Sequence, residues 1–169
     1  MYMTQTIDDK RIEEIVTFLK SLKIKSDRFL EILNKKDRLK IQIFNEALTH
    51  SSSNHQKNHE KLEFFGDAVL RLSASDFIDK AYRNLSVGKR SELRSQIVSD
   101  AWLTNLGKQI DIEKVIIKGP KAMGDKNSKD TIIAEITEAL IGAIYKCFNS
   151  IQEINLWLDD FWGKEAEYF

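Results

Sequence analysis

Cysteine, proline and long apolar runs are all scarce in this chain of 169 residues. The single cysteine, Cys147, cannot form an internal disulfide, so a disulfide-stapled secreted domain is excluded and a reducing compartment, cytoplasmic or a plastid stroma, is expected. No apolar run approaches the roughly 20 residues that cross a bilayer, and the first residues lack the basic and apolar regions of a secretory signal. We therefore expect no membrane partner.

An excess of charge is absent as well, because 26 basic residues balance 26 acidic ones. Domains that bind nucleic acid are usually more basic than this. Two segments are locally basic: residues 20–40, and a predicted loop with the four lysines Lys118, Lys121, Lys126 and Lys129. These lysines are candidates for contacts with a phosphate backbone, although ordinary solvated surface has the same composition. Composition alone leaves the partner open.

Leucine, isoleucine, glutamate and lysine are abundant instead, and the apolar ones recur at helical spacing. The polar residues 49–59 interrupt this pattern and predict a loop. Asp8 or Asp9 can cap a first predicted helix, and Ser26 or Asp27 can cap a short second one. Further helices are predicted over about 39–49, 59–82, 88–99, 100–109, 130–148 and 151–162. Ser86 can cap the helix over 88–99, and Ser128 or Asp130 can cap the one that reaches about 148. The chain has few glycines and no internal repeat, so we predict an all-α fold in a single domain, residues 1–169.

The predicted helix over 59–82 carries an acidic stripe. At about 100° per residue, Glu60, Glu63 and Asp67 fall within a sector roughly 60° wide. The opposite side is the expected core face, with Leu62, Phe65, Val69 and Leu72. A wet acidic face on an ordinary amphipathic helix explains this pattern equally well. Phe64 does not fit that interpretation, because an exposed phenylalanine among the acids suggests that a partner subunit covers it.

The predicted helix from about 130 to 148 is apolar on nearly every side, which is typical of a buried helix. Glu135 and Glu138 form its only charged stripe beyond the first turn, and no lysine or arginine lies beside them in that stretch. A buried carboxylate costs several kcal/mol unless a cation, a proton or a metal ion compensates it. The small residues Gly66 and Gly142 would let the two acidic helices approach closely.

If the two stripes face each other, up to five carboxylates line one small volume, and their repulsion calls for divalent cations. With no histidine or cysteine expected nearby, ligation by oxygen alone favours Mg²⁺, with Mn²⁺ as a substitute. Such a site suits the hydrolysis of phosphodiesters. The candidate catalytic residues are Glu60, Glu63, Asp67, Glu135 and Glu138, and the last four of these are the candidate metal ligands.

The segment Glu60–Leu70 (EKLEFFGDAVL) resembles the signature motif of the ribonuclease III family, E-R-L-E-F-L-G-D-[AS]-[VIL]-L. Ala47–Ser51 (ALTHS), Leu93–Ser99 (LRSQIVS) and Glu138–Tyr145 (EALIGAIY) are similar to three further motifs of that family, in the same order and spacing. The resemblance covers about residues 10–163.

This resemblance implies an all-α endonuclease domain that forms a two-fold homodimer, depends on a divalent metal and cuts double-stranded RNA in RNA processing. It also implies that Glu63, Asp67 and Glu138 are metal ligands, that Glu60 is a supporting acid, and that Phe64 enters a pocket on the partner subunit. The expected products carry 5′-phosphate and 3′-hydroxyl ends with short 3′ overhangs. An A-form duplex is read mainly by its shape and backbone.

Two features depart from the family pattern. Glu135 stands where the family usually has an aspartate, so its carboxylate reaches one methylene further, and we expect activity to survive. After Trp162 too little chain remains for the double-stranded-RNA-binding domain that bacterial members usually carry, so none is expected.

Other interpretations remain open at this point. One is an inactive ribonuclease III-like scaffold that only binds RNA, and another is an all-α nucleotide pyrophosphohydrolase, which also uses E-x-x-E and magnesium. A di-iron carboxylate bundle would need Glu-x-x-His pairs, and the sequence has none. We interpret the loop histidines His50, His55 and His59 as solvent-facing or capping residues, and the three tryptophans as packing residues.

Overall fold

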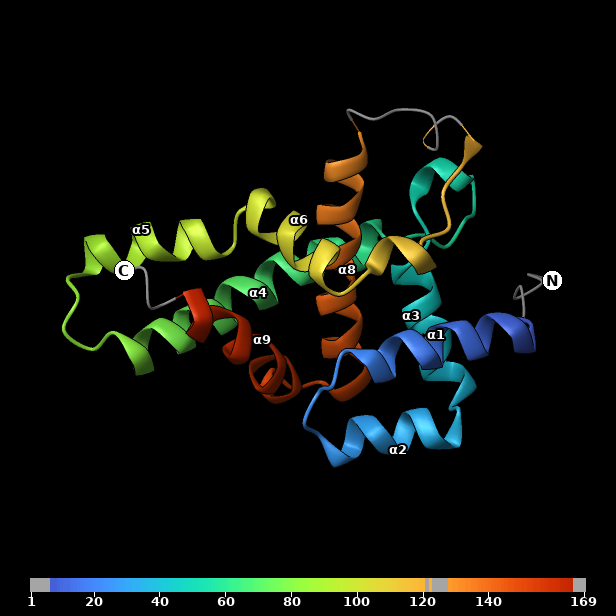
Figure 1. Ribbon diagram of the computed structural model, residues 1–169, viewed down its shortest axis with the longest axis horizontal. Helices are drawn as coiled ribbons and strands as arrows, with labels where there is room; N and C mark the ends of the chain where they lie inside the picture. The colour runs from blue at the N-terminus through green and yellow to red at the C-terminus, as the bar shows by residue number, and fades with distance from the viewer. Residues whose placement is uncertain (1–6, 121, 123–127, 166–169) are drawn as a thin grey trace.

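The computed structural model describes residues 7–120, 122 and 128–165, and these form helices and loops with one isolated bridge, between Thr49 and Ile117 (Figure 1). The elements are, in chain order, α1 (Asp9–Ser21), α2 (Asp27–Lys35), α3 (Arg38–Ala47), the short 3-10 helix η1 (Ser51–Ser53), α4 (Glu60–Ala81), α5 (Val87–Ile97), α6 (Asp100–Gln109), the 3-10 helix η2 (Ile112–Val115), α8 (Lys129–Phe148) and α9 (Gln152–Glu165). The predicted all-α fold is confirmed. Across the described part of the chain, we find no helix with the length and apolar character of a membrane span.

Local sequence signals place the helix ends. Asp8 accepts a hydrogen bond from the backbone N–H of Arg11 at 2.7 Å, and Ser26 caps α2 in the same way. Ser86 caps α5 and Ser99 caps α6. Each of these side chains satisfies a backbone donor that a helix start leaves free, which explains why the predicted and observed boundaries lie close together.

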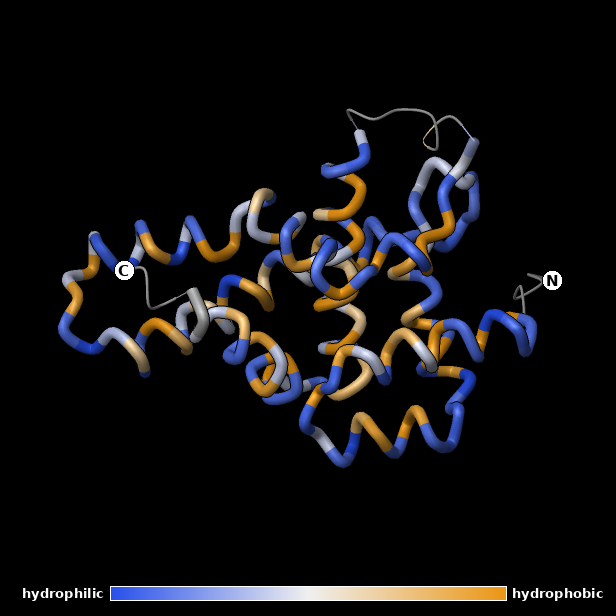
Figure 2. The backbone as a smooth tube through the Cα atoms, viewed as in Figure 1, coloured by the Kyte–Doolittle hydropathy of each residue, from blue (hydrophilic) through white to orange (hydrophobic). Residues whose placement is uncertain are grey.

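Helix α8 is the centre of the molecule, and α3, α4 and α6 pack around it (Figures 1 and 2). Its apolar side chains are buried on all sides, as its sequence predicted. The three tryptophans Trp102, Trp157 and Trp162 and the single Cys147 are also buried in the core, which confirms the packing role expected for them.

Two glycines let α4 and α8 cross at very short range. A Cβ atom added at Gly66 would lie 2.0 Å from the carbonyl oxygen of Glu138, and one added at Gly142 would lie 2.0 Å from that of Leu62. Real Cβ atoms do not approach a carbonyl so closely, so only glycine fits at either position. The close approach of the two acidic helices, predicted from these small residues, is confirmed.

The core face of α4 differs from the prediction. Leu62 and Val69 are buried as expected, but Phe65 is 37% exposed and Leu72 is 55% exposed, so the prediction for these two is wrong. The buried side of α4 is instead made by Leu62, Gly66, Val69, Leu70, Ser73, Ala74 and Ile78. Gly66 of this set lies directly against the backbone of Glu138 at the crossing with α8.

Candidate active site

Carboxylates from three helices gather around the crossing of α4 and α8. Burial and the charges of three nearby carboxylates, those of Asp67, Glu63 and Asp100, together raise the pKa of Glu138 to about 7. These electrostatic effects require the charges to lie close together, so the structure brings Glu63 and Asp67 of α4 to Glu138 of α8. We call Glu63, Asp67, Asp100 and Glu138 the acid cluster.

Asp100 was not among the residues singled out from the sequence. It is the first residue of α6, directly after the cap Ser99, and its negative charge raises the pKa of both Glu63 and Glu138. In the sequence it looks like an ordinary acid in the first turn of a helix, where the helix dipole favours one. Only the packing of α6 against α8 brings it to the acid cluster.

Glu63 and Glu60 lie one turn apart at the start of α4. Burial raises the pKa of Glu63, the charges of Glu135 and Glu60 raise it further, and His59 acts in the opposite direction. The side chain of Glu60 is exposed, and it contributes to the cluster through its charge. Glu60 therefore lies at the rim of the site, and the supporting role that the resemblance implies for it stays a prediction.

Among the described residues, one cation acts on Glu138 of the acid cluster. Arg71 lies one turn after Asp67 on α4, and its Nε atom is 2.7 Å from Oδ1 of Asp67. The charge of Arg71 partly offsets the raised pKa of Glu138. Both partners of this ion pair are about half exposed, so the pair is weak and can rearrange when another cation approaches.

Glu135 lies beside the acid cluster and has partners of a different kind. Its Oε2 atom is 3.3 Å from Nε2 of His50 and 3.6 Å from Nε2 of His59. The contact with His59 lowers the pKa of Glu135 more than burial raises it, and His50, which lies within hydrogen-bond distance, adds to this effect. Nε2 of His59 also lies 3.3 Å from Glu63, so this ring connects α4 to α8.

The prediction for the histidines was therefore wrong in part. His59 is only 2% exposed, and the expectation that no histidine lies near the carboxylates does not hold. His50, His59 and Glu135 can each offer one ligand atom within 4.8 Å of the others. The capping interpretation is correct for His50, whose Nδ1 accepts a hydrogen bond from the backbone N–H of Ser52.

The predicted loop 49–59 is ordered by its backbone. The N–H of His50 donates to the carbonyl of Ile117 at 2.8 Å, and the N–H of His59 donates to the carbonyl of Thr49 at 2.9 Å. A Cβ atom at Gly119 would lie 2.0 Å from the carbonyl oxygen of Ser52, so the segment after η2 packs directly on this loop. The two histidines are thus held against α8 by contacts between segments far apart in the sequence.

Phe64 is 79% exposed and stands on α4 next to Glu63, with the edge of its ring against Phe65 at a centroid distance of 6.0 Å. Of the four candidate lysines, Lys118 and Lys129 both contact Glu113, at 3.4 and 2.9 Å. Lys121 and Lys126 lie outside the described residues. Contacts of these lysines with a substrate therefore stay a prediction.

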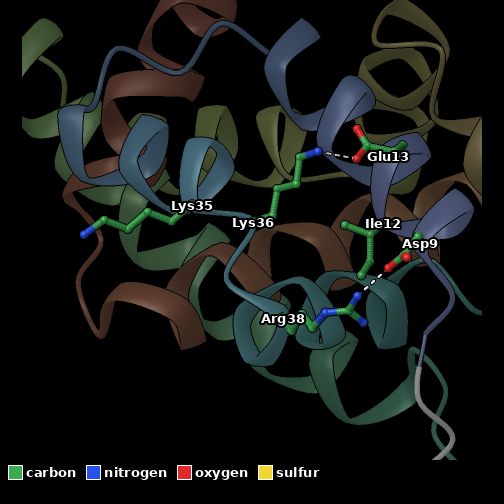
Figure 3. Close-up of a pocket in the computed structure, with 6 residues that line it drawn as sticks. All are labelled: Asp9, Ile12, Glu13, Lys35, Lys36 and Arg38. Atoms are coloured by element: carbon green, nitrogen blue, oxygen red, sulfur yellow. Dashed lines mark hydrogen bonds and ion pairs between the residues drawn. The ribbon is translucent and has the colours of Figure 1, made fainter.

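A depression of about 410 Å³ lies on another part of the molecule, where α1, the end of α2 and the start of α3 meet (Figure 3). Its lining residues are Asp9, Ile12, Glu13, Lys35, Lys36 and Arg38. Ion pairs join Lys36 to Glu13 and Arg38 to Asp9 across it, so its charges are largely compensated (Figure 3). It shares no residue with the acid cluster.

Comparison with known proteins agrees with the motifs. The Ribonuclease-III-like family matches residues 40–154. The chain is 46% identical over 161 residues to "Ribonuclease 3" of Prochlorococcus marinus, covering 95% of this chain and 64% of that protein. It is 37% identical to "Ribonuclease 3 2" of Synechocystis sp., covering 68% of this chain and 47% of the relative. The chain thus spans about half to two thirds of the length of these curated relatives.

Solved structures show the same fold. The nuclease domain of ribonuclease III from Campylobacter jejuni superposes with a TM-score of 0.64 at 23% identity, covering 90% of each chain. Dicer from Pichia stipitis superposes with a TM-score of 0.63 at 26% identity, covering 76% of this chain and 56% of Dicer. With the family match over most of its length and this helical fold, the chain belongs to the ribonuclease III family.

Proposed function

We propose that this chain is a metal-dependent endonuclease that hydrolyses the phosphodiester bonds of double-stranded RNA as a homodimer. The observation that carries the proposal is the convergence of Glu63 and Asp67 from α4 with Glu138 from α8, where mutual repulsion and burial raise the pKa of Glu138 to about 7. A family of ribonucleases and a helical fold shared with nuclease domains support the same reaction.

The acid cluster fits a hard divalent cation. It combines several carboxylates within a partly buried volume, and among the described residues only Arg71 acts on Glu138 as an opposing charge. Mg²⁺ prefers oxygen ligands, and Mn²⁺ accepts the same set. Glu63, Asp67 and Glu138 would hold the ion, with Glu135 as the fourth candidate.

A divalent ion held by these residues would supply a lowered pKa for an attacking water and positive charge for the reacting phosphate. Water adds to phosphorus and the bond to the 3′ oxygen breaks, so the proton passes to the leaving oxygen and the ends are 5′-phosphate and 3′-hydroxyl. A bound cation would favour the ionised form of Glu138 and so oppose the burial and the neighbouring carboxylates that raise its pKa. Glu60 keeps the rim of the site negative, which favours cations over free anions.

The experiment that tests this proposal uses long duplex RNA with Mg²⁺, with Mg²⁺ plus excess EDTA, and with Mn²⁺ after EDTA. We expect cutting with Mg²⁺, none after chelation, and recovery with Mn²⁺, measured by gel electrophoresis and end analysis. A single strand of the same sequence is the substrate control and should remain intact. Binding of the duplex without any cutting would contradict the enzyme and favour an RNA-binding scaffold.

Phe64 supports the dimer. A phenylalanine that is 79% exposed on the helix that carries the acids offers an apolar contact to a second copy. The nuclease domain of Campylobacter jejuni ribonuclease III has a region involved in dimer formation. A two-fold dimer would place two acid clusters on one duplex, which fits staggered cuts with short 3′ overhangs.

Replacing Phe64 with serine should weaken the dimer about a hundredfold, because losing a buried aromatic anchor costs roughly 2–4 kcal/mol of binding free energy. The dissociation constant can be measured by analytical ultracentrifugation. Leu39, which is 83% exposed on α3, provides the matched control, and Leu39→Ser should leave the constant unchanged. A Phe64→Ser protein that dimerises like the wild type would contradict the proposed interface.

A further inference from the structure

We propose that His50 and His59 are positioning residues: His50 holds the carboxylate of Glu135 with its Nε2–H group, and His59, stacked on His50, places its own Nε2–H group between Glu63 and Glu135. The inference rests on the proposed function, because Glu135 is a candidate ligand there.

The neighbours of His50 decide which ring nitrogen carries the hydrogen. The backbone N–H of Ser52 lies 3.2 Å from Nδ1 and can only donate, so Nδ1 must accept. The hydroxyl of Ser52, 2.7 Å from the same nitrogen, accepts from the N–H of Gly119 at 3.0 Å and so has its own hydrogen free for Nδ1. In the neutral ring the hydrogen is then on Nε2, which faces Oε2 of Glu135 at 3.3 Å.

His59 reaches the same state for a different reason. Its Nδ1 is buried and has no hydrogen-bond partner among the described residues. A buried N–H without an acceptor is costly, so the hydrogen belongs on Nε2. There it faces Glu63 at 3.3 Å and Glu135 at 3.6 Å. The two rings stack with centroids 4.8 Å apart, which fixes them relative to each other.

The contacts with the two rings restrict a side chain that otherwise has three rotatable bonds. Oε2 of Glu135 lies 3.3 Å from Nε2 of His50 and 3.6 Å from Nε2 of His59, and the rings themselves are held by the loop and by their stacking. The carboxylate of Glu135 is therefore oriented beside Glu63 and Glu138. Outer-shell hydrogen bonds of this kind commonly change metal affinity by about 10–100-fold.

A transition metal such as zinc, bound directly by the two rings, is the competing use of the same three side chains. It would require a bare Nε2 on His50 and hence a hydrogen on Nδ1. That hydrogen would point at the backbone N–H of Ser52, which is also a donor. The local hydrogen bonds thus favour positioning over direct ligation.

The test uses the full chain without metal and with Mn²⁺. Long-range proton–nitrogen NMR should show His50 in the Nε2–H form, a readout that is independent of activity. Mn²⁺ titration followed by electron paramagnetic resonance should show about tenfold weaker binding for His50→Ala. In His50→Gln the amide nitrogen can take the place of Nε2 as a hydrogen-bond donor. This variant should therefore bind Mn²⁺ within about threefold of the wild type, as expected if the role of His50 is to donate from Nε2.

His55 provides the matched control. It lies in the same loop and contacts the hydroxyl of Ser53 at 2.8 Å, so His55→Ala removes an imidazole bonded to a serine but leaves Glu135 untouched. Its Mn²⁺ affinity should equal that of the wild type. If His50→Ala does not fold, as judged by its melting curve, Ser52→Ala replaces it and should weaken Mn²⁺ binding by about tenfold through loss of the same ring geometry.

Three results would overturn the inference: His50 in the Nδ1–H form, wild-type Mn²⁺ affinity in a folded His50→Ala protein, or tight Zn²⁺ binding that both His50→Ala and His59→Ala abolish. Each of these results is measured from the tautomer of His50 or from the metal affinity of the protein, and not from RNA cleavage. Failure of the proposed function has a different signature, because wild-type protein would then leave duplex RNA uncut whatever the state of the histidines.

Discussion

Replacing Glu138 with glutamine should lower kcat on duplex RNA by about two to three orders of magnitude. The variant keeps the shape of the side chain but removes the charge at the centre of the acid cluster, where burial and neighbouring carboxylates already raise the pKa to about 7. A bound metal contributes several kcal/mol to the stabilisation of the transition state, and roughly 1.4 kcal/mol corresponds to a tenfold change in rate. Single-turnover cleavage of a labelled duplex measures the effect.

The same substitution should change how stability depends on pH in the absence of metal. A carboxyl whose pKa is near 7 when folded and near 4.5 when unfolded binds more protons in the folded state, so its contribution is fully present below pH 4.5 and is lost as pH rises through 7. Glu138→Gln should therefore gain roughly 1–2 kcal/mol over the wild type at pH 8, a figure lowered for solvent screening, and nothing at pH 4. Thermal melting at the two pH values with EDTA present checks the sign.

Asp130 is the control on the same helix. It is exposed in the first turn of α8 and pairs with Lys108 at 2.7 Å, away from the crossing. Asp130→Asn should leave kcat and the pH dependence of melting unchanged. Cleavage at the wild-type rate by Glu138→Gln, in a protein that folds, would remove Glu138 from the active site and with it the central argument of the proposed function.

Replacing Gly142 with alanine should destabilise the fold by about 3 kcal/mol, at the upper end of the range for overpacking, because the added Cβ meets backbone and not a movable side chain. The clash is with the carbonyl oxygen of Leu62 at 2.0 Å, and the N atom of Gly66 lies at 3.1 Å. The better helix propensity of alanine, about 1 kcal/mol, does not offset it. Urea denaturation followed by circular dichroism measures the free energy of unfolding.

Gly88 and Gly142 make a matched pair, since both lie within helices but differ in their surroundings. A Cβ atom at Gly88 would meet nothing within 4 Å, so Gly88→Ala should stabilise the protein by about 0.5–1 kcal/mol. If Gly142→Ala lowers the free energy of unfolding and Gly88→Ala raises it, the α4–α8 crossing depends on close backbone contact. Equal and small effects would show that α4 can move away from α8 at little cost.

The acids of the candidate site were found from the sequence because their signal is local. Glu60, Glu63 and Asp67 recur at helical spacing within α4, and Glu135 and Glu138 stand out in a helix that is otherwise apolar. Caps and helix ends follow from the same short-range rules, which act over three or four residues. The glycines Gly66 and Gly142 even indicated that the helices would meet closely.

The sequence patterns did not indicate that Asp100, Arg71 and His59 lie at the candidate site. Asp100 reaches the acid cluster only because α6 packs on α8, and His59 is buried because its loop is held by the segment around residue 117. The exposure of Phe65 and Leu72 also depends on packing, since it is Gly66 of α4 that lies against α8 at the crossing. Helical periodicity shows which residues share a face of a helix. Where apolar residues lie on more than one side, it does not say which side packs against the neighbouring helix.

The helices, their caps, the acids they carry and the family of the chain all follow from the order of the amino acids. Tertiary packing sets which face of α4 meets α8, which further charges join the acids, and how two loop histidines come to contact Glu135. The reason is physical: capping and periodicity depend on neighbours along the chain, whereas burial and the pKa of a carboxyl depend on charges that other segments bring to it.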